Sequence, residues 1–400
     1  MPVPAIVLLR RLRKSVGSMS GLTQPGQSFT LTPASEMSTH SRPLRRPRPS
    51  LKTWRASAPT IHEVARRAHV SSATVSRVMS GTKFVSGELA ERVWDAVREL
   101  DYRPNHVARN LRARATSTIG VVIPDIQNPF FTSLVRGIED ALQAQKFTLL
   151  LANSDGDSGR ERTCLDTLCA EEVAGLLVVP CNAEPGAYDH LVKQGVPLVA
   201  VDRSPAGLNV DLVGVTNEEG ARAAVRHLVG LGWNRIALVG GPLSTNVAVE
   251  REQGYRRALE DAGLPFAPSL IVRADFREEG GYQAMSELLC VTPRPTAVFV
   301  ANNLMAMGAL RAISDAGLRV PDDIALVLFD DIPWGARVNP PLTAVVQPTY
   351  DLGVSAARIL LDRIFEPHRP VRRVALQTTL IVRASCGAGL PDRTRPDSSP

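Results

Sequence analysis

Residues 60–104 carry an apolar pattern of helical period that is interrupted twice. Thr60 and Glu63 have the spacing of a reciprocal N-terminal cap, and Ser71 stands where it can cap a second helix. Pro104 ends the third segment, because proline cannot continue a helix. The apolar positions that share a face are Ile61, Val64, Ala65 and Ala68, then Val75, Val78 and Met79, then Leu89, Val93, Ala96, Val97 and Leu100. The pattern predicts three short helices, with a tight corner between the first two.

From residue 118 onward, short apolar runs alternate with amphipathic helical stretches. The runs read IGVVI, FTLLL, GLLVVP, PLVAVD, RIALVG, AVFVA and IALVLF. Strands that alternate with helices are typical of parallel sheets covered on both faces. About 270 residues of this pattern predict two doubly wound lobes. Ligands in such folds bind beyond the carboxyl ends of the strands, so the residues after each run are candidates for a site.

The second predicted helix has one outward face that suits DNA. Ser72, Ala73, Thr74 and Arg77 lie on this face, opposite the apolar positions. An exposed Arg on a helix in the major groove can contact guanine through two hydrogen bonds, worth about 1–3 kcal/mol of base discrimination. The alternative is a helical hairpin with an ordinary basic face.

The charge distribution favours a polyanion bound at one end of the chain. Residues 1–115 hold 20 Lys and Arg against 7 Asp and Glu, a charge of +13, which leaves −7 for the rest of a chain whose net charge is +6. No uninterrupted apolar span of membrane length occurs. The five cysteines are expected to be reduced, buried thiols of a cytosolic protein. The histidines show no ligand spacing, so we assign no metal, and no cofactor motif appears.

Polar or aromatic residues follow the predicted strands. They are Asp125–Phe131, Asp202 and Arg203, Asn302 and Asn303, and Asp330 and Asp331, and Arg251 and Phe276 are candidates to join them. Carboxylates, amides and Arg can bind neighbouring hydroxyls while aromatic rings pack on a sugar face, so we expect a sugar pocket in one interlobe cleft. We expect Arg251 and Asp330 to face each other across it. Alternatively, Asp202 and Asp330 cap turns, and Phe276 belongs to the core.

The three-helix segment is followed by VS-x-E-x-A-E-R-V, YRPN-x-VAR-x-L and IGVVIPDIQNPFF. With these motifs the chain closely resembles the lactose-repressor (LacI/GalR) family of bacterial transcription regulators, up to about residue 385. The resemblance implies an all-α helix-turn-helix headpiece plus two doubly wound parallel-sheet lobes of periplasmic-binding-protein type. Two residues depart from the family pattern: His69 stands where Gly is usual in the helical corner, and Asn303 replaces the usual Asp.

The resemblance also assigns site residues. A hinge helix within 105–117 would place Leu111 in the minor groove as a wedge; otherwise Leu111 anchors the next domain. The DNA-binding candidates are Thr60, Ser71, Ser72, Ala73, Thr74, Ser76, Arg77, Asn105, His106, Ala108, Leu111 and Arg112. The effector-binding candidates are Phe130, Asp202, Arg251, Phe276, Asn303 and Asp330.

The sequence thus predicts a disordered basic extension (1–57), a headpiece (58–104), a hinge (105–117), an effector and dimerisation domain (118–386) and a disordered tail (387–400). Residues 1–57 are either a basic tail that adds nonspecific phosphate affinity or a segment upstream of the true translation start.

We expect a cytoplasmic, nucleoid-associated repressor that binds a pseudo-palindromic operator as a homodimer or dimer of dimers and responds to a sugar. It is expected to have no catalytic residues and no membrane partner, since the nucleophile and phosphate-loop motifs of enzymes are missing from the sequence. The alternatives are a purine or nucleoside effector, or a solute-binding protein of a sugar transporter; inducer and corepressor action both stay open.

Overall fold

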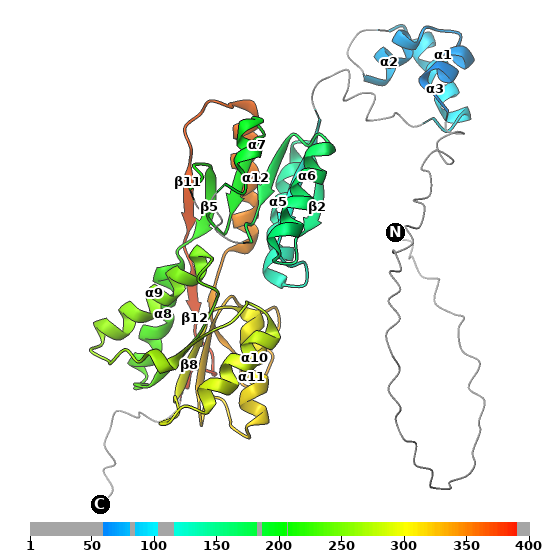
Figure 1. The fold of residues 1–400 in the computed structure, drawn as a ribbon. Helices are drawn as coiled ribbons and strands as arrows, with labels where there is room; N and C mark the ends of the chain where they lie inside the picture. The colour runs from blue at the N-terminus through cyan, green and yellow to red at the C-terminus, as the bar shows by residue number, and fades with distance from the viewer. Residues whose placement is uncertain (1–58, 81–84, 103–115, 182–185, 206, 390–400) are drawn as a thin grey trace, which may run out of the picture. The chain divides into compact units, whose positions relative to one another are not determined.

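The computed structural model describes residues 59–80, 85–102, 116–181, 186–205 and 207–389. They form two compact units, one helical and one α/β (Figure 1). The predicted extension 1–57, residues 105–115 of the predicted hinge and residues 390–400 of the predicted tail lie outside the described residues.

The helical unit consists of α1 (Ile61–Ala68), α2 (Ser72–Ser80) and α3 (Gly87–Glu99). Both halves of the predicted cap of α1 are present, because the Glu63 amide donates to Thr60 Oγ1 (3.3 Å) and the Thr60 amide donates to Glu63 Oε2 (2.6 Å). The side chains at the predicted apolar positions, apart from Leu89, pack into one small core around Val64, Val75 and Val93, each fully buried. The three helices and, with that exception, their inward faces were predicted correctly.

The corner between α1 and α2 has a left-handed backbone at His69, the position where the family usually has Gly. His69 has φ 53° and ψ 46°, a conformation that costs a non-glycine residue about 1–2 kcal/mol. Arg92 of α3 donates from Nη2 to the carbonyl oxygen of Ala68 (2.6 Å). This bond satisfies a carbonyl at the end of α1 and holds the strained corner against the third helix.

The α/β unit has two lobes, each with a six-stranded sheet. In the first lobe the order is β11-β5-β4-β3-β1-β2, and all neighbours are parallel. Helices α5 and α12 pack on one face of this sheet, and α6 and α7 pack on the other. The strands are β1 (Thr118–Ile123), β2 (Thr148–Asn153), β3 (Gly175–Val178), β4 (Leu198–Val201), β5 (Asp211–Val215) and β11 (Arg373–Leu376). The helices are α5 (Pro129–Ala144), α6 (Ser158–Ala170), α7 (Asp189–Lys193) and α12 (Thr349–Phe365).

The second lobe repeats this order as β12-β10-β9-β8-β6-β7, with only β12 antiparallel to its neighbour among the described pairs. Helices α8 and α9 pack together beside the sheet, and α10 and α11 pack together on its other side (Figure 1). The strands are β6 (Ile236–Gly240), β7 (Ile271–Arg273), β8 (Ala297–Val300), β9 (Ala325–Phe329), β10 (Thr343–Val346) and β12 (Thr379–Ile381). The helices are α8 (Asn217–Gly230), α9 (Asn246–Asp261), α10 (Glu278–Leu289) and α11 (Asn303–Asp315), with a 3-10 turn η2 (Pro268–Leu270) before β7.

The chain passes between the lobes three times: after β5, after β10 and between β11 and β12. Two of these crossings are bonded to each other, because the Thr378 amide donates to Thr216 Oγ1 (3.2 Å). The prediction of two doubly wound lobes is confirmed. Of the twelve strands within the described residues, seven were predicted from the sequence; those missed are β5, β7, β10, β11 and β12, which have three to five residues each.

The prediction for the thiols is only partly right. All five cysteines lie within the described residues and are free. Cys181 and Cys386 are buried, but Cys290 is exposed because it follows the last turn of α10. Among the described residues, no helix combines the length and the apolar character needed to cross a membrane.

Candidate functional site

The predicted DNA-reading face of α2 is exposed in the structure. Val75 is buried and Val78 packs beside it, while Ala73 and Arg77 are exposed on the other side of the helix. Ser71 caps α2, since its Oγ accepts from the Thr74 amide (3.1 Å). Ser72 and Ser76 are partly exposed on the same helix.

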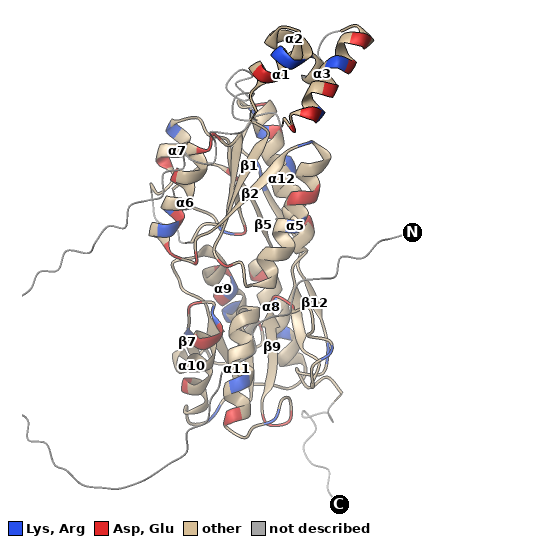
Figure 2. Cartoon of the chain, turned by 90° about the vertical axis from the view of Figure 1, so that its right-hand side faces the viewer, with Lys and Arg blue, Asp and Glu red and all other residues tan. Residues whose placement is uncertain are grey.

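Charge distinguishes α3 from the other two helices of this unit. Arg77 is the only charged residue of α2, and α1 carries two arginines against Glu63, whereas α3 carries four acidic residues against two arginines (Figure 2). A net acidic helix repels phosphates, so α1 and α2 suit a duplex better than α3. The candidates Asn105, His106, Ala108, Leu111 and Arg112 lie outside the described residues.

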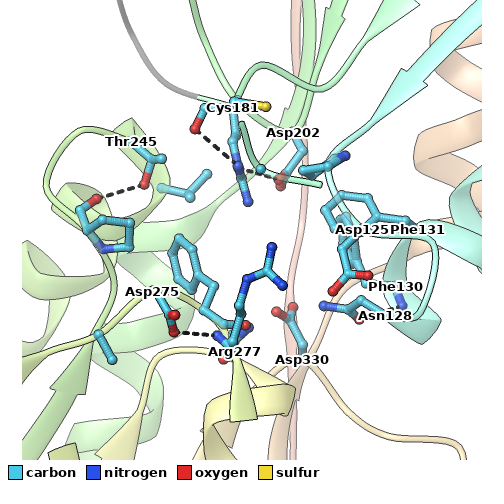
Figure 3. Close-up of a pocket in the computed structure, with 18 of the residues that line it drawn as sticks. Asp125, Asn128, Phe130, Phe131, Cys181, Asp202, Thr245, Asp275, Arg277 and Asp330 are labelled. Atoms are coloured by element: carbon cyan, nitrogen blue, oxygen red, sulfur yellow. Dashed lines mark hydrogen bonds and ion pairs between the residues drawn. The ribbon is translucent and has the colours of Figure 1, made fainter. Parts of the chain in front are cut away.

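A cavity of about 390 Å³ lies between the two lobes, at the carboxyl ends of their strands (Figure 3). Five of the six predicted effector residues line it: Phe130, Asp202, Arg251, Phe276 and Asp330. The lining also includes Asn128, Phe131, Arg203 and Asn302, which lie in the strand-end segments that the sequence analysis selected. Four further lining residues were not selected, namely Cys181, Asp275, Arg277 and Gln347.

Three of the lining residues have a left-handed backbone although none is glycine. Asp202 (φ 63°) follows β4, Asp330 (φ 67°) follows β9, and Phe276 (φ 67°) follows β7. Such strain is held only where the surrounding structure fixes it, and it is typical of functional sites. Since β4 and β9 occupy equivalent places in the two sheets, the two aspartates are equivalent positions of a repeated lobe.

Arg251 and Asp330 form a buried pair within the second lobe. Arg251 Nη1 lies 3.4 Å from Asp330 Oδ2, and the two side chains are 3% and 8% exposed. The expectation that they face each other across the cleft is wrong, because α9 and β9 belong to the same lobe. Their guanidinium and carboxylate meet directly, at one wall of the cavity.

Further contacts fix this pair. Arg251 donates from Nε to Asn217 Oδ1 (2.9 Å) and from Nη1 to the Ala301 carbonyl (2.7 Å). Its guanidinium carbon lies 3.8 Å from the centre of the Phe329 ring. Gln347 donates to Asp330 Oδ1. This wall of the cavity is therefore held in place by contacts within the protein.

Asp202 and Arg203 form the facing wall, in the first lobe. Arg203 Nε lies 3.6 Å from Asp202 Oδ2, beyond hydrogen-bond distance. Arg203 is held instead by the Pro180 carbonyl (3.2 Å), and its guanidinium carbon lies 5.5 Å from the centre of the Phe276 ring. Burial raises the pKa of Asp202 to about 6, although Arg203 and Arg251 oppose the shift.

The sixth predicted residue, Asn303, does not line the cavity. It is fully buried, and its side chain exchanges hydrogen bonds with Asn128 of the first lobe. Its neighbour Asn302 lines the cavity, accepts from the Met305 amide (2.9 Å) and donates to the Phe276 carbonyl (2.9 Å). Both asparagines follow β8, so the strand-end rule found the segment, but it could not tell which of two adjacent amides points inward.

The same rule also selected Asp331, which the structure places elsewhere. Asp331 forms a two-bond pair with Arg383 (2.6 and 2.9 Å) and does not line the main cavity. In contrast, Arg203 and Asn128 line the cavity, and both lie within the strand-end segments that the rule selected. Arg277 and Gln347 carried no such signal, because one follows a three-residue strand and the other a strand that the sequence did not reveal.

A helical DNA-binding unit joined to a two-lobed α/β unit with an interlobe cavity defines the class of ligand-responsive transcription regulators. Residues 60–105 match the family described as "Bacterial regulatory proteins, lacI family", and residues 225–386 match a "Periplasmic binding protein-like domain". The chain is 37% identical to the ribose operon repressor of Haemophilus influenzae over 82% of this chain and 98% of that protein. It is 36% identical to the transcriptional repressor PurR of Aliivibrio salmonicida, with the same coverage. The chain belongs to the LacI family of bacterial transcription regulators.

Two solved structures show how far the similarity extends. The Lac repressor dimer bound to operator and the anti-inducer ONPF matches 82% of this chain and 99% of its own, with 30% identity and a TM-score of 0.74. The complex of the transcriptional regulator CelR with cellobiose has the same coverage, 36% identity and a TM-score of 0.63. The family and fold that the sequence predicted are confirmed.

Proposed function

We propose that this chain is an operator-binding repressor whose DNA affinity is set by a neutral polyhydroxyl effector, a sugar, bound in the interlobe cavity. The observation that carries the sugar is the set of polar atoms in the cavity walls. Asp202 Oδ1, Arg203 Nε and Gln347 Oε1 are buried and have no hydrogen-bond partner within the described residues. Two of them need a donor and one needs an acceptor, and a hydroxyl is both.

The charges of the cavity favour a neutral ligand over an anion. Arg251 is paired with Asp330, and Arg277 is paired with Asp155 (3.1 Å). Arg203 lies beside Asp202. Since each guanidinium has a carboxylate near it, a phosphate or carboxylate ligand would have to compete with these partners. A ligand that donates hydroxyls to Asp202 adds bonds without breaking a pair.

A purine or nucleoside is the second candidate. Phe130 and Phe131 meet edge to face with ring centres 4.9 Å apart, and Phe276 lies among the lining residues. Aromatic faces stack on bases as readily as on a sugar ring. The relative named PurR fits this alternative, whereas the CelR–cellobiose complex fits a sugar.

The proposed assembly is a homodimer on a pseudo-palindromic operator. One recognition helix reads few base pairs, and a twofold axis doubles the site. The Lac repressor relative is a dimer on its operator. Here Ser72, Ala73 and Arg77 would read bases, while Thr60, Ser71, Thr74 and Ser76 would serve at the helix starts and at the phosphates.

The family match and the headpiece favour a cytoplasmic regulator over a transporter's solute-binding protein, which needs no DNA-binding unit. We further propose that the cavity binds its ligand without converting it. Recovery of unchanged ligand, followed by NMR, checks this point.

The test joins ligand binding to DNA binding. An operator is first selected from random duplexes with the full-length chain. Calorimetric titration with pentoses, hexoses, disaccharides and purines then identifies the ligand, and gel shifts on the operator and a scrambled duplex measure its effect. A sugar that binds and changes only operator affinity supports the proposal. Binding of purines alone selects the second candidate, and ligand binding with no effect on operator affinity rejects effector control.

A further inference from the structure

Two polar bridges join the lobes beside the cavity. Asn128, at the start of α5, exchanges side-chain hydrogen bonds with Asn303, at the start of α11. Arg277, after β7, donates from Nη2 to the Asp155 carbonyl (2.7 Å) and to Asp155 Oδ1 (3.1 Å) after β2. We propose that these four residues form an interlobe clasp that holds the cleft closed before the effector binds.

The asparagine pair is reciprocal and buried. Asn128 Nδ2 donates to Asn303 Oδ1 (3.2 Å), and Asn303 Nδ2 donates to Asn128 Oδ1 (3.0 Å). Their exposed fractions are 6% and 0%. Two amides can form this closed pair only while the lobes are together, so each of the two bonds is lost when the cleft opens.

The orientation of each amide is fixed by its own helix. Asn128 Oδ1 also accepts from the Phe130 amide (3.0 Å), and Asn303 Oδ1 accepts from the Leu304 amide (2.8 Å). Both oxygens are therefore bound to backbone N–H groups, which leaves each Nδ2 to donate to the other lobe. The pair is thus selected by local geometry as well as by lobe closure.

The two bridges differ in kind. Asn303 does not line the cavity, so it contributes to closure without needing an effector contact. The Asp155–Arg277 pair is about half exposed, with side chains 41% and 50% exposed. Water and salt screen an exposed ion pair, so the asparagine pair is the stronger part of the clasp.

The clasp rests on the proposed function in one respect. If the effector binds the closed cleft, its apparent affinity scales with the closed fraction, so weakening the clasp weakens binding. The closure itself is measurable without any effector.

A backbone amide reports the closed state directly. Ser204 of the first lobe donates its N–H to Asn246 Oδ1 of α9 in the second lobe (2.9 Å). Because its acceptor lies in the other lobe, its hydrogen exchange follows cleft opening. Neither residue belongs to the clasp.

The experiment measures Ser204 exchange in the effector-free, full-length chain. Asn303→Leu keeps the number and branching of the side-chain heavy atoms and removes both amide bonds, so we expect roughly tenfold faster exchange; Arg277→Ala should give about two- to fourfold. Arg311→Ala is the matched control. Arg311 is also an exposed arginine of the second lobe, but it pairs with Glu279 of the same lobe (2.7 Å), so its loss should leave Ser204 protection unchanged.

Unchanged Ser204 exchange in both clasp variants overturns the clasp. Equal acceleration by Arg311→Ala also overturns it, since the effect would then be general destabilisation. Where a ligand is known, Asn303→Leu should raise its apparent dissociation constant by the ratio of the wild-type closed fraction to the variant's closed fraction, which is much smaller than the factor seen in exchange while most molecules stay closed. Failure of the wild-type chain to bind any sugar or purine counts against the proposed function and leaves the exchange result to decide on the clasp.

Discussion

Replacing Asp202 by Asn should stabilise the protein and weaken its effector binding at the same time. Burial raises the pKa of Asp202 from 3.8 to about 6, so the folded chain holds the proton more tightly than the unfolded chain. Between these two values the folded state binds more protons, and its stability falls as the pH rises. At 1.36 kcal/mol per pKa unit, ionised Asp202 costs the folded protein about 3 kcal/mol above pH 6.

Asn has the shape of the protonated carboxyl group and lacks its charge. The raised pKa already includes the attraction of Arg203 and Arg251, so the same figure is the upper bound for the gain of Asp202→Asn. We expect up to about 3 kcal/mol more stability at pH 7.5, a smaller gain as the pH falls from 6 toward 3.8, and no gain well below pH 3.8, where Asp202 is protonated in both states.

Urea unfolding of the effector-free chain at pH 4.5, 6 and 7.5 measures this difference. Glu287→Gln, a change at an exposed carboxylate of α10, is the control and should follow the wild type at each pH. In the titration with sugar, loss of a hydrogen bond to a charged group should weaken binding by about 1.5–3 kcal/mol, or roughly 10- to 150-fold. Lower stability of Asp202→Asn at pH 7.5, or unchanged sugar affinity, would refute the reasoning.

Three further predictions concern other parts of the molecule. Arg77→Ala should lose about 1–3 kcal/mol of operator binding but keep weak nonspecific binding in gel-shift titrations. The control is Arg66→Ala, a change at an exposed arginine of α1. Equal losses on operator and scrambled duplexes would make Arg77 a phosphate contact. His69→Gly should stabilise the headpiece by about 0.5–1 kcal/mol, because the strain energy that it relieves exceeds the free-energy cost of the extra unfolded-state entropy of Gly. The gain in stability should appear as slower hydrogen exchange in α1. Asp211→Asn should cost about 3–5 kcal/mol, since it leaves buried Arg369 and largely buried Arg363 without their carboxylate. Those arginines hold the pKa of Asp211 below 3.8 despite its burial, so the stability that the ionised carboxylate contributes is present above pH 3.8 and is lost as the pH falls lower. Acid unfolding of the wild type and the Asp211→Asn variant checks this.

The sequence was sufficient for the headpiece because its folding signals are local. A cap such as Thr60 with Glu63 joins residues three positions apart, and the apolar stripes repeat within one helix. The tight corner at His69 was also predicted, since a single turn forms it. For these elements, neighbours along the chain decide the structure.

The sheets were predicted where their strands are long and buried, and missed where they are short. Strand β5 alternates between buried and half-buried positions, and β11 at the sheet edge is exposed at every second residue. Their apolar runs, LVGV and VAL, are short and are flanked by charged or polar residues. Strand β12 has three residues and forms only because β10 lies beside it, a contact far away in the sequence.

The sequence predicted where the cavity lies but not which of its side chains pair with each other. Asp202, Asp330 and Arg251 could be selected because each follows a strand or lies on the helix after one. Which of them meet depends on the three interlobe crossings, and no local pattern encodes these. Asn303 shows the limit: one position along the chain separates a cavity-lining amide from an amide of the interlobe clasp.

The repeated lobes place two aspartates at equivalent strained positions, yet their surroundings differ. Asp330 accepts from Arg251 of its own lobe and from Gln347 of the interlobe crossing after β10, so both its carboxylate oxygens have partners. Asp202 has Arg203 only at 3.6 Å and one oxygen with no partner within the described residues. A ligand therefore meets a completed wall on the second lobe and an incomplete one on the first. A buried polar group gains the most free energy from a new hydrogen bond where it lacks a partner. Ligand hydroxyls that bind Asp202 should therefore stabilise the closed cleft more than the same hydroxyls at Asp330.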